Sequence, residues 1–250
     1  EAEARAEADR LAAQGLETSV YGVPAYSTLG WMNWAGGDPL LSTFIGYPDG
    51  ELARLVFHEL AHQVAYAPGD TGFNESFATA VERLGVQRWL DAPAGGGSDE
   101  ARQAYQRFDG RRRQFRALAA STREEVTAIY EPNQRSAQDP RAQLALKTIA
   151  MQHFREQYAQ LRATWNGYAG YDPWVARANN ASFGAQAAYD EGVPAFEALF
   201  ESEGRDWQRF YDAVRRLAAL PRAERDARLK SDSPPAWAEM RTPGPLPLRP

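Results

Sequence analysis

The sequence contains no cysteine and only three histidines among its 250 residues. The absence of cysteine excludes disulfides and thiolate metal sites, so any metal ion must be held by His, Asp or Glu. The sequence also lacks a run of about 18 apolar residues, which is the length that a membrane-spanning helix needs. A net charge of -5 gives no indication of nucleic-acid binding. These absences are consistent with a globular protein in which few kinds of side chain are available to bind a metal ion.

The composition is 44% hydrophobic and 24% charged, which is typical of a globular domain with a substantial core. We expect residues 1–230 to form a single domain. Residues 231–250 contain six prolines, which favours an extended tail. The chain starts at Glu1 without an initiator Met or a signal peptide. We therefore expect a processed form from which targeting information has been removed.

Helical apolar periodicity dominates the sequence, and two β-prone segments interrupt it near the start. Thr18–Val23 and Thr43–Tyr47 are those segments, and they predict a small β-sheet. The predicted fold is therefore mostly α, of the α+β class, with the sheet preceding the second helix. The spacing predicts helices over residues 1–14, 52–66, 74–90, 99–130, 140–165, 194–203 and 206–220.

Two of the three histidines stand four residues apart, in His58-Glu59-Leu60-Ala61-His62. On a helix, residues i and i+4 share one face, so both imidazoles can bind one metal ion. Glu59 is adjacent to His58 and can reach a water molecule on that metal. This H-E-x-x-H arrangement is the minimum equipment of a zinc metallopeptidase.

A catalytic zinc ion needs three protein ligands and one open position for water. Glu75 is the best candidate for the third ligand, because it begins the next predicted helix. Twelve residues separate it from His62, and the turn near Pro68-Gly69 would make the two helices neighbours. The sequence therefore predicts a Zn²⁺ site formed by His58, His62 and Glu75.

Glu59 is the expected general base, which takes a proton from the attacking water and delivers it to the leaving amine. The oxyanion needs a further donor from elsewhere in the chain. Tyr168 and Tyr171 are the preferred candidates, because they flank a glycine in an aromatic-rich loop. His153 and Tyr189 are alternatives, and each of these residues could instead be structural.

Other polar residues near the motif have two interpretations. Thr79 and Asn74 could orient the histidines, although Asn74 could equally cap a helix. Asp70 is more easily read as a loop residue than as a further carboxylate near the metal. The β-prone segment Ala25–Leu29, or alternatively Ser42-Thr43-Phe44, could pair with a substrate backbone or be purely structural.

The pairing of His58–His62 with Asn74-Glu75-Ser76-Phe77-Ala78 resembles the gluzincin metallopeptidases, whose third zinc ligand is a Glu on the following helix. The chain is also similar, over most of residues 20–220, to a bacterial family known as putative aminopeptidases. The segments that carry this second resemblance are Tyr21–Trp31, Asp38–Ser42, Phe57–Gln63, Pro68–Thr71, Phe73–Ala78, Asn179-Asn180 and Val193–Leu199.

The resemblance implies a zinc-dependent peptidase acting on a peptide substrate, with aminopeptidase activity as the first expectation. It also implies a location in the cell envelope or periplasm, as a lipoprotein in the untrimmed form. Two features depart from the well-studied aminopeptidases: a shorter linker before Glu75, and no Gly-x-Met-Glu-Asn segment to grip the substrate's amine. An endopeptidase of the same mechanism, or a catalytically quiet zinc-bearing scaffold of the envelope, therefore remains as an alternative.

Overall fold

The computed structural model describes residues 1–23, 25–92, 98–131 and 139–230. Within these ranges the regular structure is entirely helical, so the fold is all-α and the predicted β-sheet is wrong. Thr43–Tyr47 lies in a series of turns, in which the Phe44 and Ile45 amides donate to the Leu41 carbonyl. Residues with high strand propensity form a strand only where a partner strand and a buried face are available. The proline-rich tail, residues 231–250, lies outside the described residues.

The predicted helices begin and end close to the expected boundaries, and four further helices were not predicted: η1, α6, α7 and α10. No described helix is long and apolar enough to cross a bilayer. The elements are α1 (Ala2–Ala12), η1 (Asn33–Ala35), α2 (Asp49–Val64), α3 (Thr71–Asp91), α4 (Asp99–Ile129), α5 (Pro140–Thr164), α6 (Asp172–Ala176), α7 (Asn180–Asp190), α8 (Val193–Ser202), α9 (Trp207–Ala218) and α10 (Arg222–Lys230).

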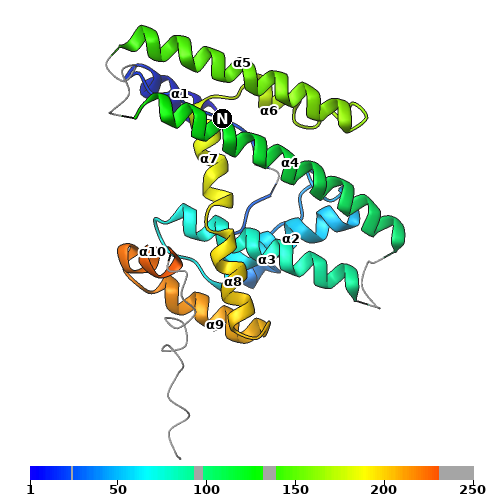
Figure 1. Ribbon diagram of the computed structural model, residues 1–250. Helices are drawn as coiled ribbons and strands as arrows, with labels where there is room; N and C mark the ends of the chain where they lie inside the picture. Colours follow the sequence, from blue (N-terminus) through cyan, green and yellow to red (C-terminus); the bar gives the residue numbers. More distant parts are fainter. Residues whose placement is uncertain (24, 93–97, 132–138, 231–250) are drawn as a thin grey trace, which may run out of the picture. The chain divides into compact units, whose positions relative to one another are not determined.

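The chain divides into two compact units (Figure 1). Unit 1 comprises Glu1–Val23 and Asp99–Ala187, and unit 2 comprises Pro24–Ser98 and the chain from Ala188 onward. The division into compact units does not test whether residues 1–230 form a single domain, so that expectation stays a prediction.

Unit 1 is built on the long helices α4 and α5, which lie side by side (Figure 1). Aromatic rings fill the space between them, with Phe115 of α4 against Phe154 and Tyr158 of α5. Both contacts are edge-on, with centroids 6.0–6.4 Å apart, which is a geometry that aromatic pairs prefer.

Unit 2 is built on a hairpin of α2 and α3, with α8 packed against α3 (Figure 1). Its core joins apolar side chains of α2, α3, α8 and α9, among them the fully buried Phe77, Phe196 and Phe210. A Cβ atom on Gly85 would lie 3.0 Å from the Phe57 ring, so the glycine allows the hairpin to close tightly. This rigid hairpin carries the residues of the predicted metal site.

The turn between α2 and α3 is held by side chains in addition to a backbone hydrogen bond from the Asp70 amide to the Ala67 carbonyl. Asp70 caps α3 by accepting from the Phe73 amide and forms a buried ion pair of 2.7 Å with Arg225. Asn74 bonds both the amide and the carbonyl of Ala67, at 2.8 and 2.9 Å. The turn therefore holds the start of α3, and with it Glu75, in one place relative to α2.

Candidate metal centre

His58 and His62 lie one helical turn apart on α2 and form the first part of the candidate site. Their rings meet edge-on with centroids 5.1 Å apart, and both side chains are buried. The buried positions of α2 include Leu55, His58 and His62, which share one face of the helix. The two imidazoles thus lie on the face that α2 turns towards the interior of unit 2.

Glu75, at the start of α3, completes a group of three ligand atoms that lie within 4.8 Å of one another. Its Oε2 is 3.2 Å from His58 Nε2 and 3.9 Å from His62 Nε2. Tetrahedral ligands at zinc–nitrogen and zinc–oxygen bond lengths stand about 3.3 Å apart. The spacing and the nitrogen–oxygen donor set therefore fit a small divalent ion, and these three residues could hold one.

Glu82 orients His58 from the side away from the ligand group. Its Oε2 lies 3.0 Å from His58 Nδ1 and 2.6 Å from the Arg54 guanidinium, and Glu82 is 2% exposed. A carboxylate on Nδ1 fixes the tautomer that leaves Nε2 free to bind a metal. Arg54 also contacts Glu51 at 3.3 Å, so the orienting carboxylate is itself held by a buried cation.

Sequence reasoning missed Glu82, for which one signal was present. Glu82 follows Glu75 by seven residues, or about two helical turns, so both side chains project from the same face of α3. Thr79 and Asn74, the predicted orienting residues, have other environments. Thr79 is fully buried and its hydroxyl finds no hydrogen-bond partner among the described residues, whereas Asn74 braces the turn. Asp70 is the cap of α3, in line with the loop interpretation.

The two histidines differ in their protonation. Burial disfavours the charged form of His58, but hydrogen bonds to Glu75 and Glu82 outweigh it and raise its pKa to about 9. Burial and the positive charge of His58 lower the pKa of His62. His62 Nδ1 is buried without a hydrogen-bond partner in the described part of the chain. Near neutral pH His58 of the metal-free site therefore carries a proton on both ring nitrogens, and a metal ion must displace the one on Nε2.

Glu59 is half-buried beside this group. Burial raises its pKa, and the carboxylates of Glu75, Asp38 and Glu82 add to the effect, while the charge of His58 opposes it. A carboxylate with a raised pKa is a better proton acceptor near neutral pH than an exposed one.

A loop over the start of unit 2 is tied to α2 next to the site. Asp38 accepts hydrogen bonds from the Thr28 amide and hydroxyl, from the Ser27 hydroxyl and from Gln63, the residue after His62. The Gln63 bond measures 2.9 Å. The segment Ala25–Leu29 forms no strand and is an irregular segment anchored by Asp38, and its pairing with a substrate backbone stays a prediction.

Among the four candidates for an oxyanion donor, Tyr189 lies beside His58, one of the candidate metal ligands. Its ring stacks on His58 with centroids 6.1 Å apart. Tyr168 and Tyr171 belong to unit 1, where they pack against the aromatic core around Phe115, and their catalytic role stays a prediction. His153, also in unit 1, is exposed and 3.7 Å from Glu125.

No curated protein and no solved structure matches the chain. A family model described as "Putative aminopeptidase" matches residues 1–229, which includes both units and every residue of the metal centre. The chain belongs to this family of putative aminopeptidases.

Proposed function

We propose that this protein is a zinc-dependent peptidase of gluzincin type, and that it acts as an aminopeptidase. The observation that carries the proposal is the convergence of His58, His62 and Glu75, with ligand atoms within 4.8 Å of one another. Two His and one Glu with an open fourth position form a ligand set that catalytic zinc sites use. The family description supports peptidase chemistry.

When bound, the zinc ion would supply Lewis-acid activation of water and of the substrate carbonyl. The protein's own residues would do the rest. Glu59 accepts the proton of the attacking water and delivers it to the leaving amine, for which its raised pKa suits it. Glu82 keeps the His58 ring in the orientation that directs Nε2 at the ion.

The test of this role is the variant Glu59→Gln, which keeps the shape of the side chain but cannot accept a proton. It should retain stoichiometric zinc by elemental analysis and lose a factor of about 10² to 10⁴ in kcat on fluorogenic peptides. Glu100→Gln, at an exposed position of α4, is the matched control. Peptide hydrolysis by Glu59→Gln at the wild-type rate would refute the mechanism.

The dependence on metal and the requirement for a free substrate amino terminus can be tested by separate experiments. His62→Ala should lose zinc, and a chelator should stop turnover of the wild type. Paired peptides that differ only in a free or acetylated amino terminus distinguish the two kinds of peptidase. Cleavage of the free peptide alone supports an aminopeptidase, and equal cleavage of both supports an endopeptidase. Zinc binding without any turnover would favour the quiet scaffold instead.

The oxyanion donor can be assigned by single hydroxyl deletions. Tyr189 is our first choice, because its ring stacks on a metal ligand. Tyr189→Phe should lower kcat by about 10²-fold, the loss typical of one oxyanion donor, with little change in KM. Tyr168→Phe and Tyr171→Phe test the two sequence-based candidates in the same assay.

A location in the cell envelope is proposed with this function, and fractionation of cells that produce the full protein tests it.

A further inference from the structure

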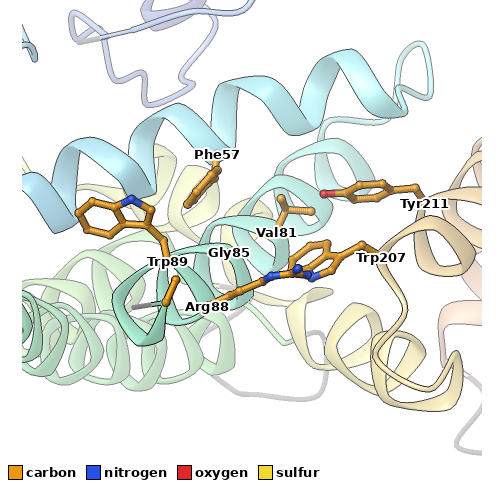
Figure 2. Close-up of a pocket in the computed structure, with 8 residues that line it drawn as sticks. Phe57, Val81, Gly85, Arg88, Trp89, Trp207 and Tyr211 are labelled. Atoms are coloured by element: carbon orange, nitrogen blue, oxygen red, sulfur yellow. The ribbon is translucent and has the colours of Figure 1, made fainter. Parts of the chain in front are cut away.

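Unit 2 contains a pocket of about 320 Å³ that is lined by none of the metal ligands. In Figure 2, the Phe57 ring points from α2 towards Gly85, and the Tyr211 ring points in from α9 with its hydroxyl leading. Phe57 directly precedes His58 in the chain, but its side chain lines this pocket. The lining residues come from α2, α3 with the residue that follows it, and α9: Phe57, Val81, Gly85, Arg88, Trp89, Ala92, Trp207 and Tyr211.

The polar side-chain groups of the lining residues are almost all hydrogen-bond donors. The guanidinium of Arg88 and the indole N–H groups of Trp89 and Trp207 can donate but cannot accept. Burial raises the pKa of Tyr211, against the opposing charges of Arg88 and Arg215, so its hydroxyl stays protonated at neutral pH and can also donate. The wall is otherwise apolar and aromatic.

The charge of the pocket has one sign. No Asp or Glu is among its lining residues, and Arg88 forms no ion pair with any residue that the structure describes. An exposed arginine beside an apolar cavity favours a ligand with an anionic end, and a carboxylate can accept two parallel hydrogen bonds from a guanidinium. The lining offers no counter-charge for an ammonium group.

From this lining we propose that the pocket binds a small apolar carboxylate, with an aromatic or branched body against the tryptophans and its carboxylate at Arg88. The volume of about 320 Å³ equals that of roughly ten liquid waters, so a ligand of about ten heavy atoms fits. Such sizes lie at the lower end of small-molecule sites. This proposal stands apart from the proposed peptidase activity, because it uses none of the metal ligands.

Three probes of nearly equal shape test the charge preference: 3-phenylpropionate, 3-phenylpropionamide and 3-phenylpropylamine. Binding to the full chain is measured by calorimetry, and by NMR of the indole N–H signals, with Trp207→Phe to assign one of them. We expect the carboxylate to bind with a Kd of about 1 mM or tighter, the amide at least tenfold more weakly, and the amine not measurably.

Arg88→Gln should weaken binding of 3-phenylpropionate by about ten- to a hundredfold and leave the amide unchanged. Arg209→Gln removes the same charge from an exposed position of α9 outside the lining and should change neither. Because carboxylates also bind zinc, the titration is repeated with His62→Ala, in which the expected affinity is that of the wild type. Equal binding of the three probes, insensitivity to Arg88→Gln, or loss of binding in His62→Ala would each overturn the proposal.

Discussion

Replacing Glu82 by Gln tests whether the orientation of His58 controls metal binding. The amide oxygen of Gln can still accept from His58 Nδ1, so the ring keeps its direction while the negative charge disappears. Arg54 bonds the same oxygen of Glu82, so it also keeps a hydrogen-bond acceptor there, together with its 3.3 Å contact with Glu51. The substitution therefore separates the charge of this carboxylate from its geometry.

Two effects of opposite sign set the magnitude. Loss of an orienting carboxylate weakens metal affinity by about 10- to 100-fold. However, His58 has a pKa of about 9 in the metal-free protein, so at pH 7 its proton weakens apparent binding by about a hundredfold. Without the charge of Glu82 this pKa falls, and the competition by the proton falls with it. The variant should therefore lose most affinity at pH 9 and less at pH 7.

Zinc titration with a competing chelator, at pH 7 and pH 9, measures both effects. Glu51→Gln is the control, since it removes the same charge from the other partner of Arg54 without contact to His58, and it should stay within about twofold of the wild type. An unchanged affinity of Glu82→Gln at pH 9, or the same loss in both variants, would refute the reasoning.

The stability of the metal-free protein should follow the same proton. The folded-state pKa of His58, about 9, lies above the ordinary histidine value of 6.5, so protonation stabilises the fold. That contribution, about 3 kcal/mol, is complete below pH 6.5 and is lost as the pH rises through 9. Thermal unfolding of the chelated protein between pH 6 and pH 10 measures it, and Glu82→Gln should flatten the profile. A pH-independent Tm in this range would contradict the assignment.

Two further substitutions test how α3 is held. Gly192→Ala would place a Cβ 2.8 Å from the Ser76 hydroxyl, which bonds the Gly192 amide, and should cost about 1–3 kcal/mol in urea unfolding. Gly184→Ala, in a helix with open space around it, should instead gain up to about 1 kcal/mol, and equal effects would refute the steric argument. Asp70→Ala leaves Arg225 buried without its carboxylate and should cost about 3–5 kcal/mol by the same measurement. A loss below 1 kcal/mol would show that this ion pair and cap are dispensable.

The helices and the clustering of His58, His62 and Glu75 were predictable because both depend on local spacing. The two histidines need only a helix to share one face. The short turn between α2 and α3 makes the helices neighbours, and this brings Glu75 back alongside α2. The sheet was wrongly predicted because β-propensity at Thr18–Val23 and Thr43–Tyr47 says nothing about partner strands. Phe44 instead packs with Ala25 and Leu55 in a small cluster against α2.

The supporting residues could not be predicted in the same way, because their roles depend on tertiary contacts. A Glu in a helix is usually solvated, and only the packing of α2 on α3 reveals that Glu82 is 2% exposed and bonded to His58. Arg54 likewise shares a face with His58, but its sequence position does not disclose a partner 28 residues away. Tyr189 reaches His58 from α7, far along the chain.

The connected charges explain why this cluster suits a divalent ion. Arg54, Glu51, Glu82, His58 and Glu75 form one chain of hydrogen bonds and ion pairs, largely shielded from solvent. With His58 protonated, this group keeps one negative charge in excess. Exchange of that proton for a divalent cation brings the group to neutrality, which reduces the cost of burying its charges. A monovalent cation would leave the charge unchanged, so the protonated His58 is best understood as an occupant that a divalent metal replaces with a gain.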